Sequence, residues 1–282
     1  MKTPAVSVVM TTYNAPQFLN ESIESVINQT FSDFEFIIVD DGSTENNCDI
    51  IRSYGDPRIV LIENEHNFIG SLNRGFKTAK GKYIARMDAD DRMHPERLEK
   101  QYNYMEEHPE IGVCGSWFQG FGSNDSVYRL TGDEKALLIQ MLSGNAMCHP
   151  STFIRKSVLE KLPGSTRSEY YRPDYIYAED YKLWCELATE GVRFTNIQEI
   201  LLFYRFSDNQ VTKHHADEMY RKTRQIQLEY FGAVTARIVR EEPAFFELVN
   251  GLIRLCNEKR MPYQRLMEIT RLIYLTFLEK AT

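Results

Sequence analysis

The sequence predicts an α/β fold, in which a mostly parallel sheet is flanked by helices and followed by a C-terminal helical appendage. Short apolar, β-branched runs alternate with amphipathic stretches over residues 1–91. The runs lack polar alternation, as in parallel strands that helices cover on both faces. Residues 213–282 contain helical patterns only. Strands that alternate with helices form right-handed crossovers, so the sheet is expected to be of the Rossmann type.

Residues 1–91 contain four expected strands and the helices that connect them. The first strand is the run VSVVM, and the helix after it carries apolar residues on one face. Gly81 stops the helix before the fourth strand. The expected strands span 6–10, 34–41, 58–64 and 82–91, and the expected helices span 17–30, 49–54 and 70–81.

Residues 92–212 are less regular. Pro95 stands early in an expected helix, a position that proline tolerates. Helices are expected at 94–110, 132–144 and 178–191, strands at 111–122 and from 200, and a strand that leads into a helix at 149–162. We divide the chain into a domain of residues 1–212, with halves 1–91 and 92–212, and a helical region of residues 213–282.

Composition and charge exclude several classes of protein. No apolar run approaches the roughly 20 residues of a membrane span, and the N-terminus turns polar too early for a secretory signal. Five scattered cysteines without a CxxC pair indicate reduced thiols and no structural zinc. Residues 1–211 carry a net charge of −10, which argues against nucleic acid as a partner. Residues 212–282 carry +3, which fits either solvated helix faces or an anionic membrane surface.

Polar and acidic groups follow three of the four expected parallel strands. They are TTYN after the first, DDGS after the second and DADD at the end of the fourth. Parallel strands bring these ends to one edge of the sheet, where ligands bind in such folds. Neither common glycine-rich phosphate loop is present, and carboxylates repel phosphate unless a divalent cation lies between them. The pattern therefore predicts a nucleoside diphosphate bound through a metal ion.

Each motif alone has an ordinary explanation. DDGS is a turn signal, DADD is typical of a solvated turn, and AED complements a helix dipole. Trp184 fits a core position as well as a platform for an acceptor, and His149 fits a structural position. The combination at one sheet edge is what favours a binding site.

Four segments together resemble family 2 glycosyltransferases. Residues 6–44, which end in VDDGST, and residues 73–91, which end in RMDADD, resemble the nucleotide-binding half of that family. AEDYKLW (178–184) resembles its ED motif, and YRFSDNQVT (204–212) resembles a later loop motif. The resemblance spans roughly residues 4–212. It implies a GT-A-like fold, a sugar-nucleotide donor and inversion at the anomeric carbon.

The resemblance also assigns nucleotide-binding roles. Thr11 and Tyr13 match the loop that contacts the base, and Asp41 matches the residue that binds the base. Asn73 lies where a helix residue approaches the nucleotide, and Asp88 matches the first carboxylate of a DxD pair, near the ribose.

The remaining assignments concern the metal and the acceptor. Asp90 matches the metal ligand of the DxD pair, which would hold Mn²⁺ or Mg²⁺, and Asp180 matches the general base. Glu179, Trp184 and His149 are expected on the acceptor side.

The later loop motif departs from the family pattern. Many relatives carry histidine where this chain has Ser207, which leaves His214 and His215 as substitutes.

The expected enzyme is a hexosyl- or N-acetylhexosaminyltransferase that uses a UDP-sugar and a saccharide or glycolipid acceptor. The family implies bacterial surface polysaccharide or lipopolysaccharide synthesis, in the cytoplasm or peripherally at the inner face of the cell membrane. Two alternatives stay open. A sugar-1-phosphate nucleotidyltransferase would carry a basic, glycine-rich loop where this chain has TTYNAP. A non-catalytic nucleotide- or sugar-binding module would bind UDP-sugars without hydrolysing them.

Overall fold

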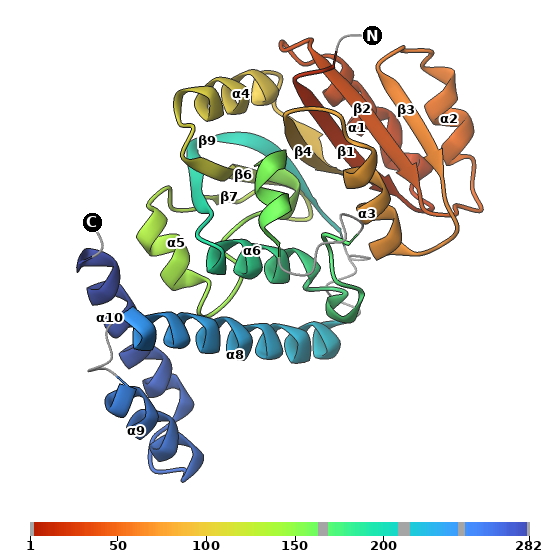
Figure 1. Ribbon diagram of the computed structural model, residues 1–282. Coiled ribbons are helices and arrows are strands. Elements are labelled where there is room, and N and C mark those ends of the chain that lie inside the picture. The colour runs from red at the N-terminus through yellow and green to blue at the C-terminus, as the bar shows by residue number, and fades with distance from the viewer. Residues whose placement is uncertain (1–2, 163–168, 208–214, 242–245, 281–282) are drawn as a thin grey trace.

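The fold is that of a curved mixed sheet between two layers of helices, with three further helices at the C-terminal end (Figure 1). The coordinates are a computed structural model, which describes residues 3–162, 169–207, 215–241 and 246–280. Within these ranges nine strands form one sheet, with the path β3-β2-β1-β4-β8-β6-β9-β5 and β7 paired to β6. All five cysteines lie in the described ranges and are free thiols.

The first half is the predicted succession of strands and helices. Its strands are β1 (Val6–Thr12), β2 (Phe34–Asp40), β3 (Ile59–Glu63) and β4 (Tyr83–Asp88). Its helices are α1 (Pro16–Ile27), α2 (Asn47–Ser53) and α3 (Phe68–Thr78). The pairs β1–β2, β1–β4 and β2–β3 are all parallel, as predicted. Every residue of β1 and β2 is buried, which explains why their sequences show no polar alternation.

Helix α3 packs tightly against the sheet at one glycine. A Cβ atom at Gly75 would stand 2.5 Å from Cγ1 of Val9 on β1, so a larger residue would require Val9 or the helix to move. The N-terminal end of α3 lies at the carboxyl end of β2, where Asn67 and Ser71 donate hydrogen bonds to Asp41. The helix therefore helps to line the sheet edge at which ligands bind in such folds.

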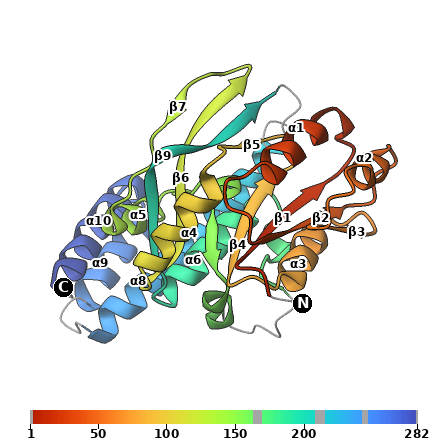
Figure 2. The same ribbon diagram turned by 90° about the horizontal axis from the view of Figure 1, so that it is seen from above.

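The second half of the sheet is mixed rather than mostly parallel. Its strands are β5 (Arg92–Met93), β6 (Ile111–Gly122), β7 (Val127–Tyr128), β8 (Phe153–Arg155) and β9 (Arg193–Phe206). Strand β8 runs antiparallel to both β4 and β6, whereas β6 and β9 are parallel. The short β8 follows the long connection after α5 and enters the sheet from the end opposite to that at which β4 and β6 begin. In Figure 2, β7 and the ends of β6 and β9 project as a ribbon.

The helices of the second half are shorter than the sequence predicted. They are α4 (Arg97–Glu107), α5 (Glu134–Gln140) and α6 (Glu179–Thr189). Three 3₁₀ turns complete the half: η1 (His149–Ser151), η2 (Lys156–Lys161) and η3 (Pro173–Tyr175). The helix expected to end the 149–162 segment is thus only the turn η2.

Two hydrophobic cores cover the two faces of the sheet, and β4 contributes to both. Ile84 lies in the core that α3 and α6 cover, whereas Tyr83, Ala85 and Met87 lie in the core that α1 and α4 cover. This alternation places Arg86 on the same face as Ile84, two positions before Asp88.

Among the described residues after 214, the regular elements are the helices α8 (Ala216–Glu241), α9 (Phe246–Asn257) and α10 (Tyr263–Lys280). Figure 1 shows α8 running alongside α6, with α9 and α10 at the end distant from β1–β4. Ile226 and Tyr230 of α8 belong to the same core as Trp184 of α6. The predicted boundary at residue 212 falls outside the described residues. Within the described ranges, no helix combines the length and apolar character that a bilayer crossing requires.

Candidate active site

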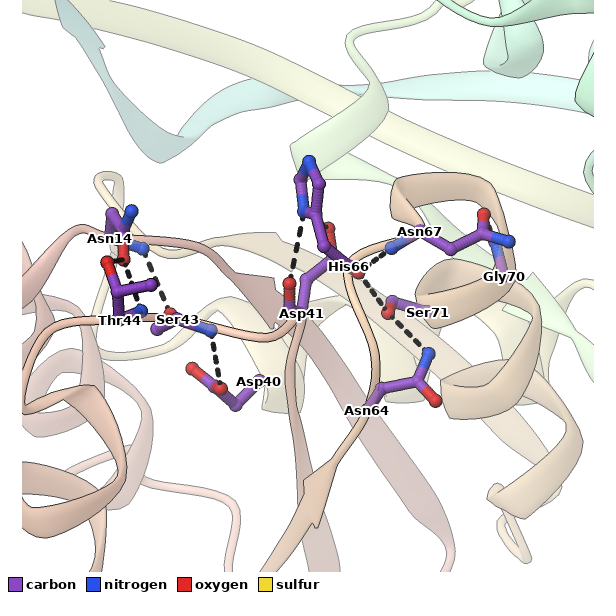
Figure 3. Close-up of polar contacts among 10 residues, drawn as sticks. All are labelled: Asn14, Asp40, Asp41, Ser43, Thr44, Asn64, His66, Asn67, Gly70 and Ser71. Atoms are coloured by element: carbon purple, nitrogen blue, oxygen red, sulfur yellow. Dashed lines mark hydrogen bonds and ion pairs between the residues drawn. The ribbon is translucent and has the colours of Figure 1, made fainter.

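The carboxyl ends of β1 and β2 are tied together by an asparagine. In the strand register Thr12 lies opposite Asp40, so the loops TTYN and DDGS leave the sheet side by side. The backbone N–H of Asn14 donates to Oγ of Ser43 at 3.0 Å, and its side-chain Oδ1 accepts from the N–H of Thr44 at 2.9 Å (Figure 3). Asn14 has a φ of +44°, a conformation that asparagine adopts more easily than most residues.

Asp41 is the buried carboxylate of this corner. Its side chain lies between the second loop and the start of α3, and the residue is 2% exposed. Oδ1 accepts from the backbone N–H of Asn67 at 2.8 Å and from Oγ of Ser71 at 2.6 Å (Figure 3). Oδ2 lies 3.0 Å from Nδ1 of His66. The side chain of Asp41 is therefore held in a fixed orientation as a hydrogen-bond acceptor at the carboxyl end of β2.

Tyr13 lies at the surface next to Asp41. Its residue is 45% exposed, and its ring stacks on the imidazole of His66 with 4.1 Å between the centroids. Thr11, by contrast, is buried within β1 and pairs in register with Asp88 of β4. The register thus places the base-side loop and the first carboxylate of DADD at one edge of the sheet.

Asn73 does not offer a free side chain to this edge. Its Nδ2 donates to the carbonyl of Tyr171 at 2.8 Å, and its Oδ1 accepts from the N–H groups of Tyr170 and Tyr171 at 2.8 and 2.9 Å. The side chain therefore fastens the 170–171 segment to α3. The nucleotide contact expected of Asn73 stays a prediction, and these bonds show that its side chain already has partners in the 170–171 segment.

Asp88, Asp90 and Asp91 form a compact acidic group. One carboxylate oxygen of each lies within 4.8 Å of the others. Asp91 is buried, and its Oδ1 accepts from the backbone N–H of Arg205 at 2.8 Å, whereas its Oδ2 has no hydrogen-bond partner among the described residues. A buried carboxylate oxygen without a donor is costly unless a cation approaches it.

The electrostatics of the acidic group fit a divalent cation. Burial and the charge of Asp88 raise the pKa of Asp90 to about 6. Burial, Asp88 and Asp90 raise the pKa of Asp91 well above its usual range. Like charges crowded in this way repel one another, and oxygen-only ligand sets of this kind suit Mn²⁺ or Mg²⁺. Asp88, Asp90 and Asp91 are thus the residues that would hold such an ion.

A second pair of carboxylates opens α6. Oδ1 of Asp180 accepts from the N–H of Tyr181 at 2.7 Å, and Oδ2 accepts from Nδ2 of Asn145 at 2.6 Å. Burial raises the pKa of Asp180, and these two hydrogen bonds oppose the rise. Glu179 is 7% exposed, and its Oε2 has no partner among the described residues. Burial and the nearby Asp180 raise the pKa of Glu179 to about 8, so this carboxyl is mostly neutral at pH 7.

Arg86 connects the two acidic groups. Its guanidinium is buried and forms an ion pair with Asp88. Burial alone would lower its pKa, but Asp88, Tyr171 and Asp91 outweigh this effect and raise it. The same positive charge opposes, without cancelling, the rise in the pKa of Asp90 and the rises of Glu179 and Asp180. One buried cation therefore influences the titration of both carboxylate groups.

Trp184 and His149 belong to the interior beneath this site. Trp184 has no exposed surface, and its ring packs edge-on against His149 and Phe194. It therefore cannot serve as the acceptor platform that the sequence left open for it. Nε2 of His149 lies 2.8 Å from the hydroxyl of Tyr171. Burial and the charge of Arg86 lower the pKa of His149, which keeps the imidazole neutral.

One of the two candidate histidines contacts the loop before the acidic pair. The ring of His215 stacks on Tyr177 at 4.1 Å, and Tyr177 adopts a φ of +70°, which is rare for a large side chain. Ser207 follows the end of β9, and His214 lies outside the described residues. The start of α8 is thus fastened to the segment that precedes Glu179.

Several site residues were not predicted from the sequence. Arg86 could have been found from the sequence. It is a charged residue inside an apolar strand, two positions before Asp88, and a buried charge needs a partner. Asn145, Arg205 and His66 carried no such signal, because their partners lie in other segments.

Replacing Glu179 by glutamine is expected to flatten the pH dependence of stability. The pKa of Glu179 rises from 4.5 to about 8 on folding, so the folded state binds more protons than the unfolded state between these values. The stabilisation is complete below the unfolded pKa and is lost as the pH rises through the folded pKa. Thermal melting from about pH 5 to about pH 9 checks this, with Glu190→Gln on the exposed end of α6 as control. Equal slopes for the wild type and Glu179→Gln would contradict the expectation.

Comparison with known proteins places the chain in a family. Residues 7–163 match the family described as Glycosyl transferase family 2. The chain is 37% identical over 232 residues to the uncharacterised glycosyltransferase MJ1057 of Methanocaldococcus jannaschii, with 78% of each chain covered. It is 28% identical to WfaP of Escherichia coli, a UDP-Glc:α-D-GlcNAc-diphosphoundecaprenol β-1,3-glucosyltransferase, over 89% of this chain and 95% of that protein.

Similarity to a solved structure supports the same conclusion for the fold. The crystal structure of Staphylococcus aureus TarS 1–349 in complex with UDP-GlcNAc superposes with a TM-score of 0.65 at 18% identity, over 81% of this chain and 66% of that one. The predicted GT-A-like fold is therefore confirmed, with the strand-end carboxylates at the edge of its sheet. By the family match and the relatives together, the chain belongs to glycosyl transferase family 2.

Proposed function

We propose that this glycosyltransferase moves a hexosyl or N-acetylhexosaminyl unit from a UDP-sugar to a hydroxyl of a saccharide or glycolipid acceptor, with inversion. The relative WfaP uses UDP-glucose and a diphosphoundecaprenol-linked acceptor, and the structural neighbour TarS holds UDP-GlcNAc. These relatives favour a role in bacterial surface polysaccharide synthesis, including lipopolysaccharide. An acceptor with a lipid anchor would place the enzyme in the cytoplasm, peripherally at the inner face of the membrane.

The observation that carries the proposal is the buried Arg86, which forms an ion pair with Asp88 of the first acidic group. Its charge also opposes the rise in the pKa of Asp90, which follows β4, and of Asp180 in α6, which supports one site served by both acidic groups. A donor diphosphate on the side of Asp90 and an acceptor hydroxyl on the side of Asp180 would then meet at the sugar ring. The buried Asp41 and the exposed Tyr13 would take the base, the carboxylate as a hydrogen-bond acceptor and the ring as a stacking face.

The chain's own groups account for the proton and for orientation. As the acceptor oxygen bonds to the anomeric carbon, the bond from that carbon to the diphosphate oxygen breaks and UDP leaves with the electron pair. The proton of the acceptor hydroxyl passes to Asp180, whose raised pKa favours this role as general base. Asn145 holds one oxygen of Asp180 and fixes its direction. Bound at Asp88, Asp90 and Asp91, Mn²⁺ or Mg²⁺ would supply Lewis-acid stabilisation of negative charge on the diphosphate.

Family membership favours transfer over the two alternatives. A sugar-1-phosphate nucleotidyltransferase would need a basic loop after β1, and TTYNAP contains no lysine or arginine. A pure binding module would not need a carboxyl of raised pKa held by hydrogen bonds at the second acidic group.

A thermal-shift panel tests the donor class. UDP and UDP-sugars with Mn²⁺ are expected to raise the melting temperature, because ligands that bind only the folded state stabilise it by RT ln(1+[L]/Kd). CDP and ADP at equal concentration serve as controls. Slow, metal-dependent release of UDP from the stabilising sugar nucleotide would then separate an enzyme from a binder. A panel in which no UDP compound shifts the melting temperature would overturn the proposal.

A further inference from the structure

We propose that His66 occupies the base subsite of the donor site when no nucleotide is bound, and that its imidazole must swing away before UDP enters. The inference rests on the proposed function, because it takes Asp41 and Tyr13 as the groups that receive the base. It makes His66 a built-in competitor of the donor, and so a residue that lowers donor affinity.

The imidazole makes the two contacts that a base would make. Its ring lies 4.1 Å from the ring of Tyr13 with an interplanar angle of 25°, which is a stacked arrangement. Its Nδ1 lies 3.0 Å from Oδ2 of Asp41 and 3.1 Å from the carbonyl oxygen of Asp41. Figure 3 shows the ring standing directly over Asp41. The imidazole of His66 is a flat heterocycle with one N–H on the carboxylate of Asp41 and one face on the ring of Tyr13. A bound base would make the same two contacts.

The two rings leave no room for a third between them. Stacked rings need a separation of roughly 3.5–4 Å for each pair, so a base inserted between Tyr13 and His66 would need about twice that distance. The centroids are only 4.1 Å apart. A base that uses this face of Tyr13 and also reaches Asp41 must therefore replace the imidazole.

Replacement requires only a side-chain rotation. The side chain of His66 is 59% exposed, so it can turn into solvent without opening the core. The backbone beside it is held, because the N–H of Asn67 donates to Oδ1 of Asp41 at 2.8 Å. Asn67 and Ser71 bond the other oxygen of Asp41, Oδ1, and keep the carboxylate in place while Oδ2 changes partner.

The same geometry selects among bases. Oδ2 of Asp41 only accepts hydrogen bonds, so the entering base must present an N–H group to recover what the imidazole gave up. The N3–H of uracil does so from the ring itself, whereas cytosine has an acceptor at N3 and offers N–H only at its exocyclic N4. Displacing His66 lowers the apparent affinity of every base by the same factor, so a base that regains the lost hydrogen bond, as uracil does, keeps the larger net affinity.

Calorimetry with UDP and Mn²⁺ on the full chain tests the inference. Because a site that is blocked most of the time loses apparent affinity by the blocked fraction, His66→Ala is expected to bind UDP roughly three- to tenfold more tightly than the wild type. His108→Ala is the matched control, since His108 is a half-exposed histidine paired with Glu110 at the end of α4. Circular dichroism confirms that each variant is folded.

The outcomes separate this inference from the proposed function. Tighter UDP binding by His66→Ala, with no change in His108→Ala, supports His66 as a competitor of the donor. Equal or weaker binding by His66→Ala, with UDP still bound, overturns it and leaves the proposed function standing. If neither the wild type nor His66→Ala binds UDP, both this inference and the proposed function are overturned.

A direct readout follows the imidazole itself. In the wild type, the proton signals of the His66 ring should lose the ring-current shift of Tyr13 when UDP is added. An unchanged His66 signal under saturating UDP would refute the displacement.

Discussion

Asp180→Asn is expected to lower the rate of sugar transfer by about 10²–10⁴-fold, the usual contribution of a positioned general base. The amide keeps the size of the side chain and can still meet the N–H of Tyr181, but it cannot take a proton. UDP affinity should not change, because Asp180 belongs to α6 and the base corner belongs to β1, β2 and α3. Initial rates of UDP release with an acceptor, beside calorimetric UDP affinity, measure both quantities.

Glu190→Gln provides the control for this variant. Glu190 is the exposed C-cap residue that directly follows α6, so the change is the same kind of substitution, carboxylate to amide, at the other end of the helix and without a role in the site. Transfer by Asp180→Asn at the wild-type rate would remove Asp180 as the base. A drop in transfer together with a loss of UDP affinity would indicate a structural effect instead.

Asp90→Ala is expected to abolish the part of UDP binding that depends on Mn²⁺ and to lower transfer by roughly 10³-fold, since Lewis-acid stabilisation contributes several kcal/mol. Calorimetric titration of UDP with and without Mn²⁺ checks the first effect. Asp125→Ala, which removes an exposed carboxylate far along the chain, is the control. Unchanged affinity for UDP in the presence of Mn²⁺ would count against a metal at DADD.

The same variant should not melt at a lower temperature than the wild type. The pKa of Asp90 is raised to about 6 on folding, so above this pH its charge disfavours the folded state. Removing the Asp90 carboxylate, which Asp88 and Asp91 repel, relieves this cost. Such a gain in stability is expected where a charged residue serves function at the expense of stability. A large drop in melting temperature for Asp90→Ala at pH 7.5 would contradict this account of the acidic group.

The sheet edge could be predicted from the sequence because topology alone determines it. Strands joined by crossover helices are parallel, so the ends of the strands that carry Asp41 and Asp88 had to meet. The register of β1 against β2 and β4 confirms this. The roles of the individual side chains at that edge stay predictions until the variants are measured.

Side-chain partners could not be predicted in the same way. Asn73 bonds a segment 98 residues away, and Trp184 is buried by the packing of α6 against the core. Such contacts depend on how distant segments pack, which neither spacing nor periodicity encodes. Likewise, no pattern in the sequence relates His66 to Tyr13 and Asp41, which it meets across the loops.

The shared core of α6 and α8 bears on how this enzyme can be shortened or recombined. Lys182 pairs with Glu229 across the two helices, and Tyr230 packs into the core that also holds Trp184. Truncation of the chain after β9 would expose to solvent the side of α6 that α8 covers, and α6 is the helix that begins with Glu179 and Asp180. Chimeras between relatives should therefore exchange residues 178–241 as one block, because catalytic power and acceptor choice would be inherited together.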